Sequence, residues 1–200
     1  MIIQHVTGLL TDPEKEWEHI RNERCTIGKC FCSHVLILAA IPAICGFIGT
    51  TKFGWQIGGR EPVMLTTDSA LIIAIIFYFT MLLAVFSVGK MIHWMARTYD
   101  AEQSLSTCIA LAAFTATPLF LVGIMQLYPV LWLNFIVGLP SLAYTVYLLY
   151  VGLPIMMGIS KDKAFLFSSA VISVGMVMLV AVLVVTALLW GFGFEPAFTG

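Results

Sequence analysis

Three cysteines and a histidine lie close together near the start of the chain, in the pattern C-x4-C-x-C-x-H. Thiolates and imidazole are the ligands that a soft or borderline metal ion prefers. Cys25, Cys30, Cys32 and His34 are therefore a candidate metal site, with His19 as a further ligand if the N-terminal segment folds back. The spacing is not that of a zinc knuckle, and it favours reduced cysteines at a membrane rim, open to lipid modification. Beyond this metal, we expect no cofactor.

A second candidate is a basic and aromatic face made by Lys90, His93, Trp94 and Arg97. Their spacing of i, i+3, i+4 and i+7 places them on one side of a helix. The pattern favours an anchor for anionic lipid headgroups, with Lys90 extended toward the membrane surface. The alternative is a cytoplasmic gate, in which this face pairs with the acidic residues of segment 12–18.

Three prolines, Pro42, Pro118 and Pro140, lie well inside apolar stretches, and Asn134 is a polar residue near the last of them. A proline frees the backbone carbonyl four residues earlier in a helix. Transporters build binding sites from such broken helices near the membrane midplane. Membrane helices also tolerate proline as a packing feature. Because we find no buried acid and no internal repeat, the sequence favours packing.

The motifs of common enzyme classes are absent from the chain. It contains no H-E-x-x-H, G-x-S-x-G, P-loop or G-x-G-x-x-G pattern. An intramembrane enzyme also needs activated polar groups at depth, and this sequence has few there. We therefore predict that the protein is not an enzyme.

The candidate residues named above must be positioned by helices that span a membrane. Apolar residues make up 60% of the 200-residue chain and charged residues 10%, and the mean hydropathy is +0.98. A soluble domain carries roughly 25% charged residues. The net charge of −1 argues against a nucleic-acid partner. The composition therefore excludes a soluble or disordered protein and indicates an integral membrane protein, whose constant partner is the lipid bilayer.

Five continuous apolar stretches predict five spanning helices. A span needs about 20 apolar residues, and continuous rather than alternating hydrophobicity favours helices over a barrel. We expect the spans at 33–51, 67–96, 104–126, 129–157 and 164–192. The predicted fold class is an all-α polytopic membrane protein, with a five-helix domain over 33–200 that follows a cytoplasmic amphipathic segment over 1–32.

Positive charge is distributed unequally between the two ends of these spans. Eight of the ten lysines and arginines fall on the side of the N-terminus, namely Lys15, Arg21, Arg24, Lys29, Lys90, Arg97, Lys161 and Lys163. Only Lys52 and Arg60 fall on the other side. Because cytoplasmic loops carry the excess of positive charge, we expect a cytoplasmic N-terminus and an external C-terminus.

The polar segment 1–32 contains a helix start at the tetrapeptide TDPE, where either Thr11 or Asp12 is the N-cap. Trp17 and Ile20 fall on an apolar face of that helix. The segment could be an amphipathic platform on the membrane that presents an acidic face to a protein partner. The sequence favours a plainer interpretation, a short helix that plugs the inner mouth of the bundle.

Several stretches carry a family resemblance across nearly the whole chain. They are LLTDPEKEW, AAIPAICGFIGTT, HWMAR, ATPLFL and YLLYVG. The chain resembles the Yip family of Ypt/Rab-GTPase-interacting membrane proteins, and within it the short bacterial branch of YohC-type inner-membrane proteins. The resemblance implies five spans, a cytoplasmic N-terminus and a place in the bacterial inner membrane. The eukaryotic relatives bind prenylated Rab GTPases, but this chain lacks their longer polar N-terminal region, so that activity is not carried over.

We therefore predict a non-catalytic scaffold or adaptor in the membrane, with a candidate protein partner at the N-terminal segment. The sequence predicts no oligomeric state. The alternative is a small-solute or metal-ion permease that uses the proline-broken spans or the cysteine and histidine cluster. A cavity among spans one, three and four that reaches Asn134 would favour the permease. A close-packed interior would favour the adaptor.

Overall fold

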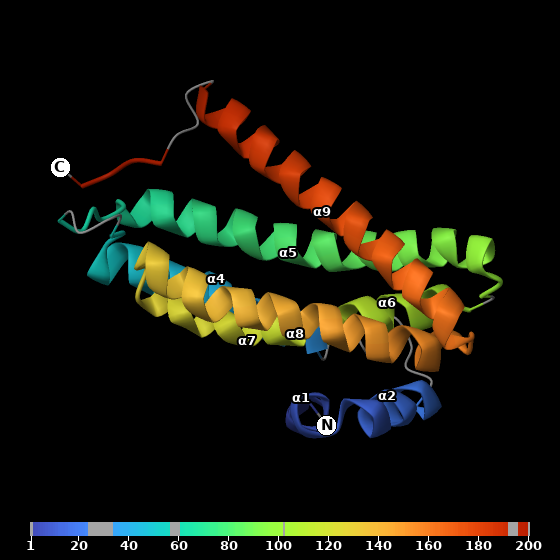
Figure 1. The fold of residues 1–200 in the computed structure, drawn as a ribbon. Coiled ribbons are helices and arrows are strands. Elements are labelled where there is room, and N and C mark those ends of the chain that lie inside the picture. Colours follow the sequence, from blue (N-terminus) through green and yellow to red (C-terminus); the bar gives the residue numbers. More distant parts are fainter. Residues whose placement is uncertain (1, 24–33, 57–60, 102, 192–195, 200) are drawn as a thin grey trace.

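The computed structural model describes residues 2–23, 34–56, 61–101, 103–191 and 196–199, and these form a helical bundle (Figure 1). Five helices in this described part are long and apolar enough to cross a membrane: Leu36–Phe53, Thr67–Tyr99, Leu105–Leu127, Leu131–Met157 and Lys161–Ala181. The predicted all-α fold class with five spans and a short N-terminal helix is confirmed.

The elements follow one another in a simple order. Two short helices, α1 (Ile2–Thr11) and α2 (Pro13–Asn22), precede the first span, which is α4 (Leu36–Ile48) continued by the π-helix η2 (Gly49–Phe53). The second span is α5 (Thr67–Ala96) with the 3-10 turn η3 (Arg97–Tyr99). The third is α6 (Leu105–Thr115), α7 (Thr117–Val122) and the 3-10 turn η4 (Gly123–Leu127). The last two are α8 (Leu131–Met157) and α9 (Lys161–Gly191).

The start of α2 resolves the choice between the two predicted caps. The side chain of Asp12 accepts a hydrogen bond from the backbone N–H of Lys15, and Pro13 occupies the first turn, where its missing N–H costs nothing. The ammonium group of Lys15 also pairs with this carboxylate and lowers the pKa of Asp12 below its usual value. Asp12 is therefore the N-cap, and it turns the chain sharply from α1 into α2.

The third span is broken at Ala116, just before Pro118. Proline has no N–H and its ring clashes with the preceding turn, so the α-helix stops at Thr115 and starts again at Thr117. Ala116 bridges the two pieces, because its carbonyl accepts the N–H groups of Leu119 and Phe120. The break was expected from the sequence, and both Thr117 and Pro118 are buried within the bundle.

Close backbone contacts join the first and third spans. A Cβ atom added at Gly123 would lie 2.4 Å from Cβ of Pro42, and one added at Gly49 would lie 2.0 Å from the carbonyl oxygen of Gln126. Small residues at such positions let membrane helices approach one another closely. The second half of the first span and the end of the third therefore pack backbone against backbone.

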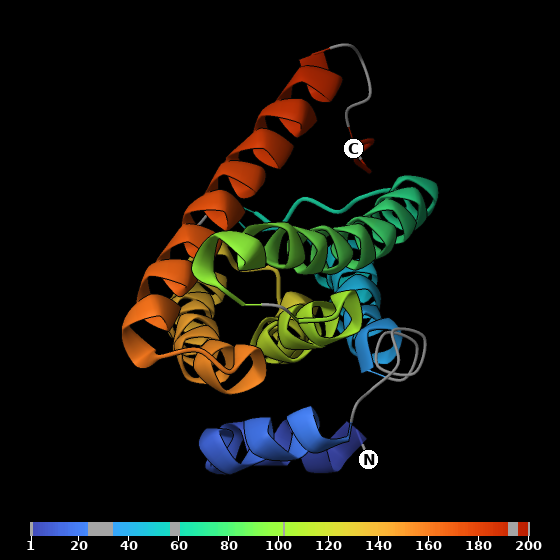
Figure 2. The same ribbon diagram turned by 90° about the vertical axis from the view of Figure 1, so that its right-hand side faces the viewer.

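Among its described side chains, the fifth span packs mainly through its first half. Phe167 stacks on Tyr99 with ring centroids 4.6 Å apart, and Lys163 donates to the carboxylate of Asp100 at 2.6 Å. Beyond Val171 the large side chains are mostly exposed, as at Met176, and the end of α9 leans out from the bundle on the side opposite α1 and α2 in both views (Figures 1 and 2). Lipid covers such apolar side chains in a membrane.

The first span is the shortest in the described part of the chain. It runs over 18 residues, Leu36–Phe53, whereas the other four run over 21 to 33 residues. Just before α4, Nε2 of the buried His34 lies 2.9 Å from the hydroxyl of Thr117. At roughly 1.5 Å per residue, Thr117 lies about 18 Å beyond the start of α6. The described beginning of the first span therefore lies beside the middle of the third.

Candidate functional site

The helices α1 and α2 form a hairpin, residues 2–23, that packs against α6 and α8. Trp17 is fully buried, and its ring occupies the space above Gly152 of α8, where an added Cβ would lie 2.4 Å from the indole. The same ring meets Phe114 of α6 edge to face, with centroids 6.5 Å apart. One large aromatic side chain thus fixes the hairpin to both the third and the fourth span.

A partly buried hydrogen bond holds the other half of the hairpin. The hydroxyl of Tyr144 on α8 donates to the carbonyl oxygen of Leu9 at 2.7 Å. Measured along α8, Gly152 lies about 8 Å and Tyr144 about 20 Å from the end of the helix at Met157. The hairpin therefore lies along the side of the bundle in Figure 1 rather than only across its end.

The outer surface of the hairpin has two kinds of exposed side chain. On α1, Ile3 is 78% exposed and Leu10 is 48% exposed. On α2, Glu14 and Glu18 are exposed. An apolar edge beside an acidic edge is typical of a helix that lies at a membrane interface.

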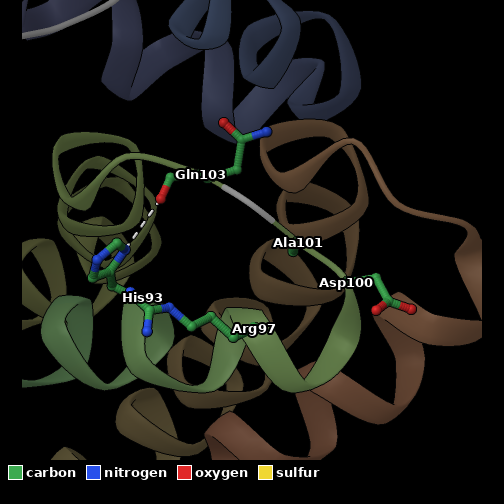
Figure 3. A pocket seen from close by; sticks show the side chains of 5 residues that line it. All are labelled: His93, Arg97, Asp100, Ala101 and Gln103. Carbon is green, nitrogen blue, oxygen red and sulfur yellow. Dashed lines mark hydrogen bonds between the residues drawn. The ribbon is translucent and has the colours of Figure 1, made fainter.

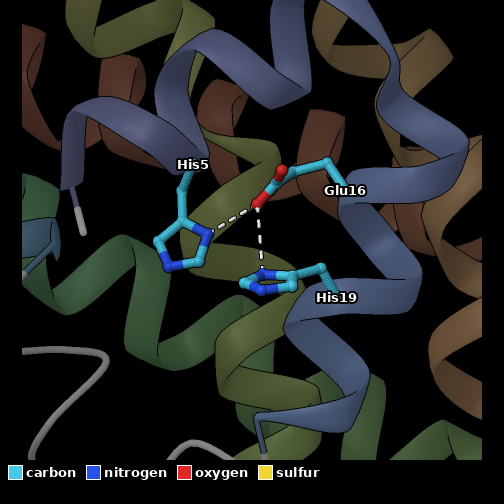
Figure 4. Close-up of side chains that lie close together, drawn as sticks. All are labelled: His5, Glu16 and His19. Carbon is cyan, nitrogen blue, oxygen red and sulfur yellow. Dashed lines mark hydrogen bonds and ion pairs between the residues drawn. The ribbon is translucent and has the colours of Figure 1, made fainter.

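Between the two helices of the hairpin lies a cluster of histidine and glutamate side chains (Figure 4). Nδ1 of the buried His5 lies 2.6 Å from Oε1 of Glu16, and Nδ1 of His19 lies 3.9 Å from the same oxygen. Glu23 approaches both histidines, at 3.5 Å from Nε2 of His5 and 3.6 Å from Nδ1 of His19. Four residues that can donate or accept protons, or bind a cation, therefore face one another.

Of the residues in this cluster, the sequence predicts a metal-binding role for His19 alone, and it places Glu16 among the acids of segment 12–18. Glu16 and His19 stand one turn apart on α2, and such a spacing is too common to be informative alone. The cluster depends on the reversal of the chain at Asp12. This reversal folds α1 back along α2 and brings His5 opposite Glu16 and His19. A prediction of the hairpin, rather than of a single helix, would have found the cluster.

The predicted cysteine and histidine site cannot be followed in full, because Cys25, Cys30 and Cys32 lie outside the described residues. His34 does not face the cytoplasm but is 2% exposed. Its Nε2 is bonded to Thr117, and its Nδ1 has no hydrogen-bond partner in the part of the chain that is described. The metal site built from these four residues stays a prediction.

The predicted basic face divides into two environments. His93 and Arg97 line a cavity of about 630 Å³ together with Asp100, Ala101 and Gln103 (Figure 3). The Nδ1 of His93 lies 3.1 Å from the backbone carbonyl of Gln103. Lys90 is exposed, and its ammonium lies 5.7 Å from the ring centre of Phe86.

Two of the four acidic residues that the gate hypothesis would pair with this face have other partners in the structure. Asp12 pairs with Lys15, and Glu16 pairs with His5. At the cavity itself, the hydrogen bond from Lys163 lowers the pKa of Asp100. The arrangement favours the anchor for anionic headgroups over the gate.

The midplane candidates do not converge on one place. Pro42 and Pro118 are buried, whereas Pro140 is exposed on the surface of α8. The amide of Asn134 donates to the carbonyl oxygens of Tyr128 and Val130 at the start of its own helix. These contacts favour packing and capping roles over a shared binding site.

The comparisons with known proteins agree with one another. The Yip1 domain matches residues 7–192. The inner membrane protein YohC from two Escherichia coli strains is 43% identical over 193 residues, which is 96% of this chain and 99% of the relative. No solved structure matches the chain.

Proposed function

The chain belongs to the Yip1 family of membrane proteins, and from this premise we propose that it is a non-catalytic scaffold that presents its N-terminal hairpin to a protein partner on the cytoplasmic side. The observation that carries the proposal is the way the hairpin is held. Trp17 and the bond from Tyr144 to Leu9 fix it to α8 at two points. Because the hairpin is fixed to the bundle, its exposed acidic edge, Glu14 and Glu18, has one orientation relative to the spans.

The close packing of the first and third spans supports the same function. Gly123 contacts Pro42, and Gly49 contacts Gln126. The side-chain amide of Asn134 donates to the carbonyl oxygen of Val130 at the start of α8. A permease would need a path between these elements, so their contacts favour the adaptor over the alternative. The chemistry of the acidic edge fits a partner with a basic surface.

Photo-crosslinking in cells tests the proposal. A crosslinking amino acid at Asn22, exposed on α2, is expected to capture a protein. The yield should fall at least several-fold when Glu14 and Glu18 are both changed to lysine, because the charges that attract the partner are reversed. The matched control is Asp162→Lys, which reverses an exposed charge on α9. An adduct that is unaffected by the double change, or equally weakened by the control, would contradict the proposal.

We also propose that the protein lies in the inner membrane, as the name of the Escherichia coli relative states for that protein, with its N-terminus in the cytoplasm. The unequal lysine and arginine count supports this orientation. The ion pair of Asp100 and Lys163 lies at the end of the bundle where most lysines and arginines gather. At the opposite end, the backbone N–H of Thr66 donates to the carbonyl oxygen of Ala197.

Reporter fusions are expected to locate the two ends on opposite sides. A reporter fused after Gly200 should be active only outside the cytoplasm, and one inserted in the 158–164 loop only within it. The same activity pattern at both positions would disprove this topology, because an even number of spans would then separate them.

A further inference from the structure

The His5, Glu16 and His19 cluster has the composition and the spacing of a metal site. One ligand atom from each of the three residues lies within 4.8 Å of the others. Imidazole nitrogens and a carboxylate oxygen are the donors that zinc and similar divalent transition metals accept, whereas magnesium and calcium prefer oxygen alone. We infer that the hairpin binds one zinc-class ion between α1 and α2, through His5, Glu16 and His19.

The present distances require only small side-chain movements for such an ion. Two ligands on a tetrahedral zinc are roughly 3.3 Å apart, given bonds of about 2.0 Å. Oε1 of Glu16 lies 3.9 Å from Nδ1 of His19, and the shorter 2.6 Å between Glu16 and His5 is a hydrogen bond that the ion would replace. His19 is 62% exposed at its side chain, so its ring can turn toward the other two.

Glu23 supplies the second contact that a metal-bound histidine generally makes. It approaches His5 from the Nε2 side, opposite to the Nδ1 that faces Glu16. A metal-bound histidine generally donates its second N–H to a carboxylate, which fixes its tautomer and orientation. With Nδ1 on the ion, Nε2–H of His5 points at Glu23, and a fourth coordination position remains for water.

The site would link metal binding to the position of the hairpin. His5 is buried against Phe114, with ring centroids 5.3 Å apart, so an ion on its Nδ1 ties α1, α2 and the third span together. This inference does not depend on the scaffold function, because it concerns only the side chains between the two helices. It differs from the predicted cysteine site in its ligands, because His19 is the one residue that both sets share.

Zinc titration of the full-length protein in detergent tests the inference. The starting protein carries Ser at Cys25, Cys30 and Cys32, so that the thiolates of that segment cannot contribute, and the two remaining cysteines, Cys45 and Cys108, are buried. We expect about one equivalent of bound zinc by elemental analysis, unaffected by a large excess of magnesium. His19→Ala and Glu16→Gln should each weaken zinc binding roughly tenfold or more.

Two comparisons make the result decisive. Glu18→Gln removes an exposed carboxylate from the same helix without touching the cluster, and it should leave zinc affinity unchanged. Because His19 is largely exposed, His19→Ala is expected to remain folded. Absence of bound zinc, displacement by magnesium, or equal affinity in His19→Ala and Glu18→Gln would each overturn the inference and leave an ion-paired hairpin.

Discussion

Gly152→Val is expected to release the N-terminal hairpin from the bundle. The added side chain would enter the space that the Trp17 indole fills, where even a Cβ lies 2.4 Å from the ring. Overpacking of a tight contact typically costs about 1–3 kcal/mol. Because this contact is one of the two that fix the hairpin to α8, we expect the cost to appear as undocking of the hairpin rather than as unfolding of the five spans.

Limited trypsin digestion of the purified protein measures this release. Lys15 and Arg21 are cleavage sites within the hairpin, and cleavage tracks the open population when docking is fast. A loss of 1–2 kcal/mol should raise the cleavage rate by about 5–30-fold. Trp17→Ala should produce the same change, since it removes the other half of the contact.

The matched control lies on the same helix. A Cβ added at Gly138 has no neighbour within 4 Å, so Gly138→Val introduces the same side chain into open space. It should leave the cleavage rate near that of the wild type. If Gly138→Val and Gly152→Val behave alike, valine acts through helix propensity and the docking contact is not the cause.

Thr117→Val is expected to destabilise the membrane domain itself. The change preserves shape but removes the hydroxyl that lies 2.9 Å from Nε2 of His34. The other ring nitrogen of His34 already has no partner among the described residues. A buried polar group left unpaired costs about 1–3 kcal/mol, and we expect a loss of that size in unfolding experiments with denaturant in mixed micelles.

A double-mutant cycle separates this effect from a simple loss of helix stability. Adding His34→Leu to Thr117→Val removes the unpaired imidazole and should recover part of the lost stability. Thr80→Val is the matched control, because the hydroxyl of Thr80 is exposed and bonds only to Ile76 of its own helix. Equal stability of Thr80→Val and Thr117→Val would show that the His34 contact contributes nothing.

The parts of the fold that sequence reasoning reached are those set by local chemistry. Long uncharged runs forced five spans, because the bilayer leaves backbone groups no other partner. Pro118 forced the break in the third span, because its ring and missing N–H act within one turn. For the N-cap of α2 the sequence left two candidates, Thr11 and Asp12, and the structure shows that Asp12 is the cap.

The parts that it missed depend on contacts between distant segments. The sequence around Gly152 does not indicate that Trp17 packs on it. His5 approaches Glu16 only because α1 folds back on α2. Pro140 looked equivalent to Pro42 and Pro118 in sequence, yet it lies on the outer surface. Which side of a uniformly apolar helix faces protein rather than lipid is not encoded in its hydrophobicity.

The attachment of the hairpin to α8 also sets an order of events during biosynthesis. The hairpin is translated before α8, and Leu9 and Tyr144 are separated by 135 residues. At about 5–20 residues per second, roughly 7–27 seconds pass between the translation of Leu9 and that of Tyr144. Until then Leu9 and Trp17 lack their contacts with α8, so the membrane insertion machinery meets the hairpin without them, and docking is completed only after the fourth span has been made.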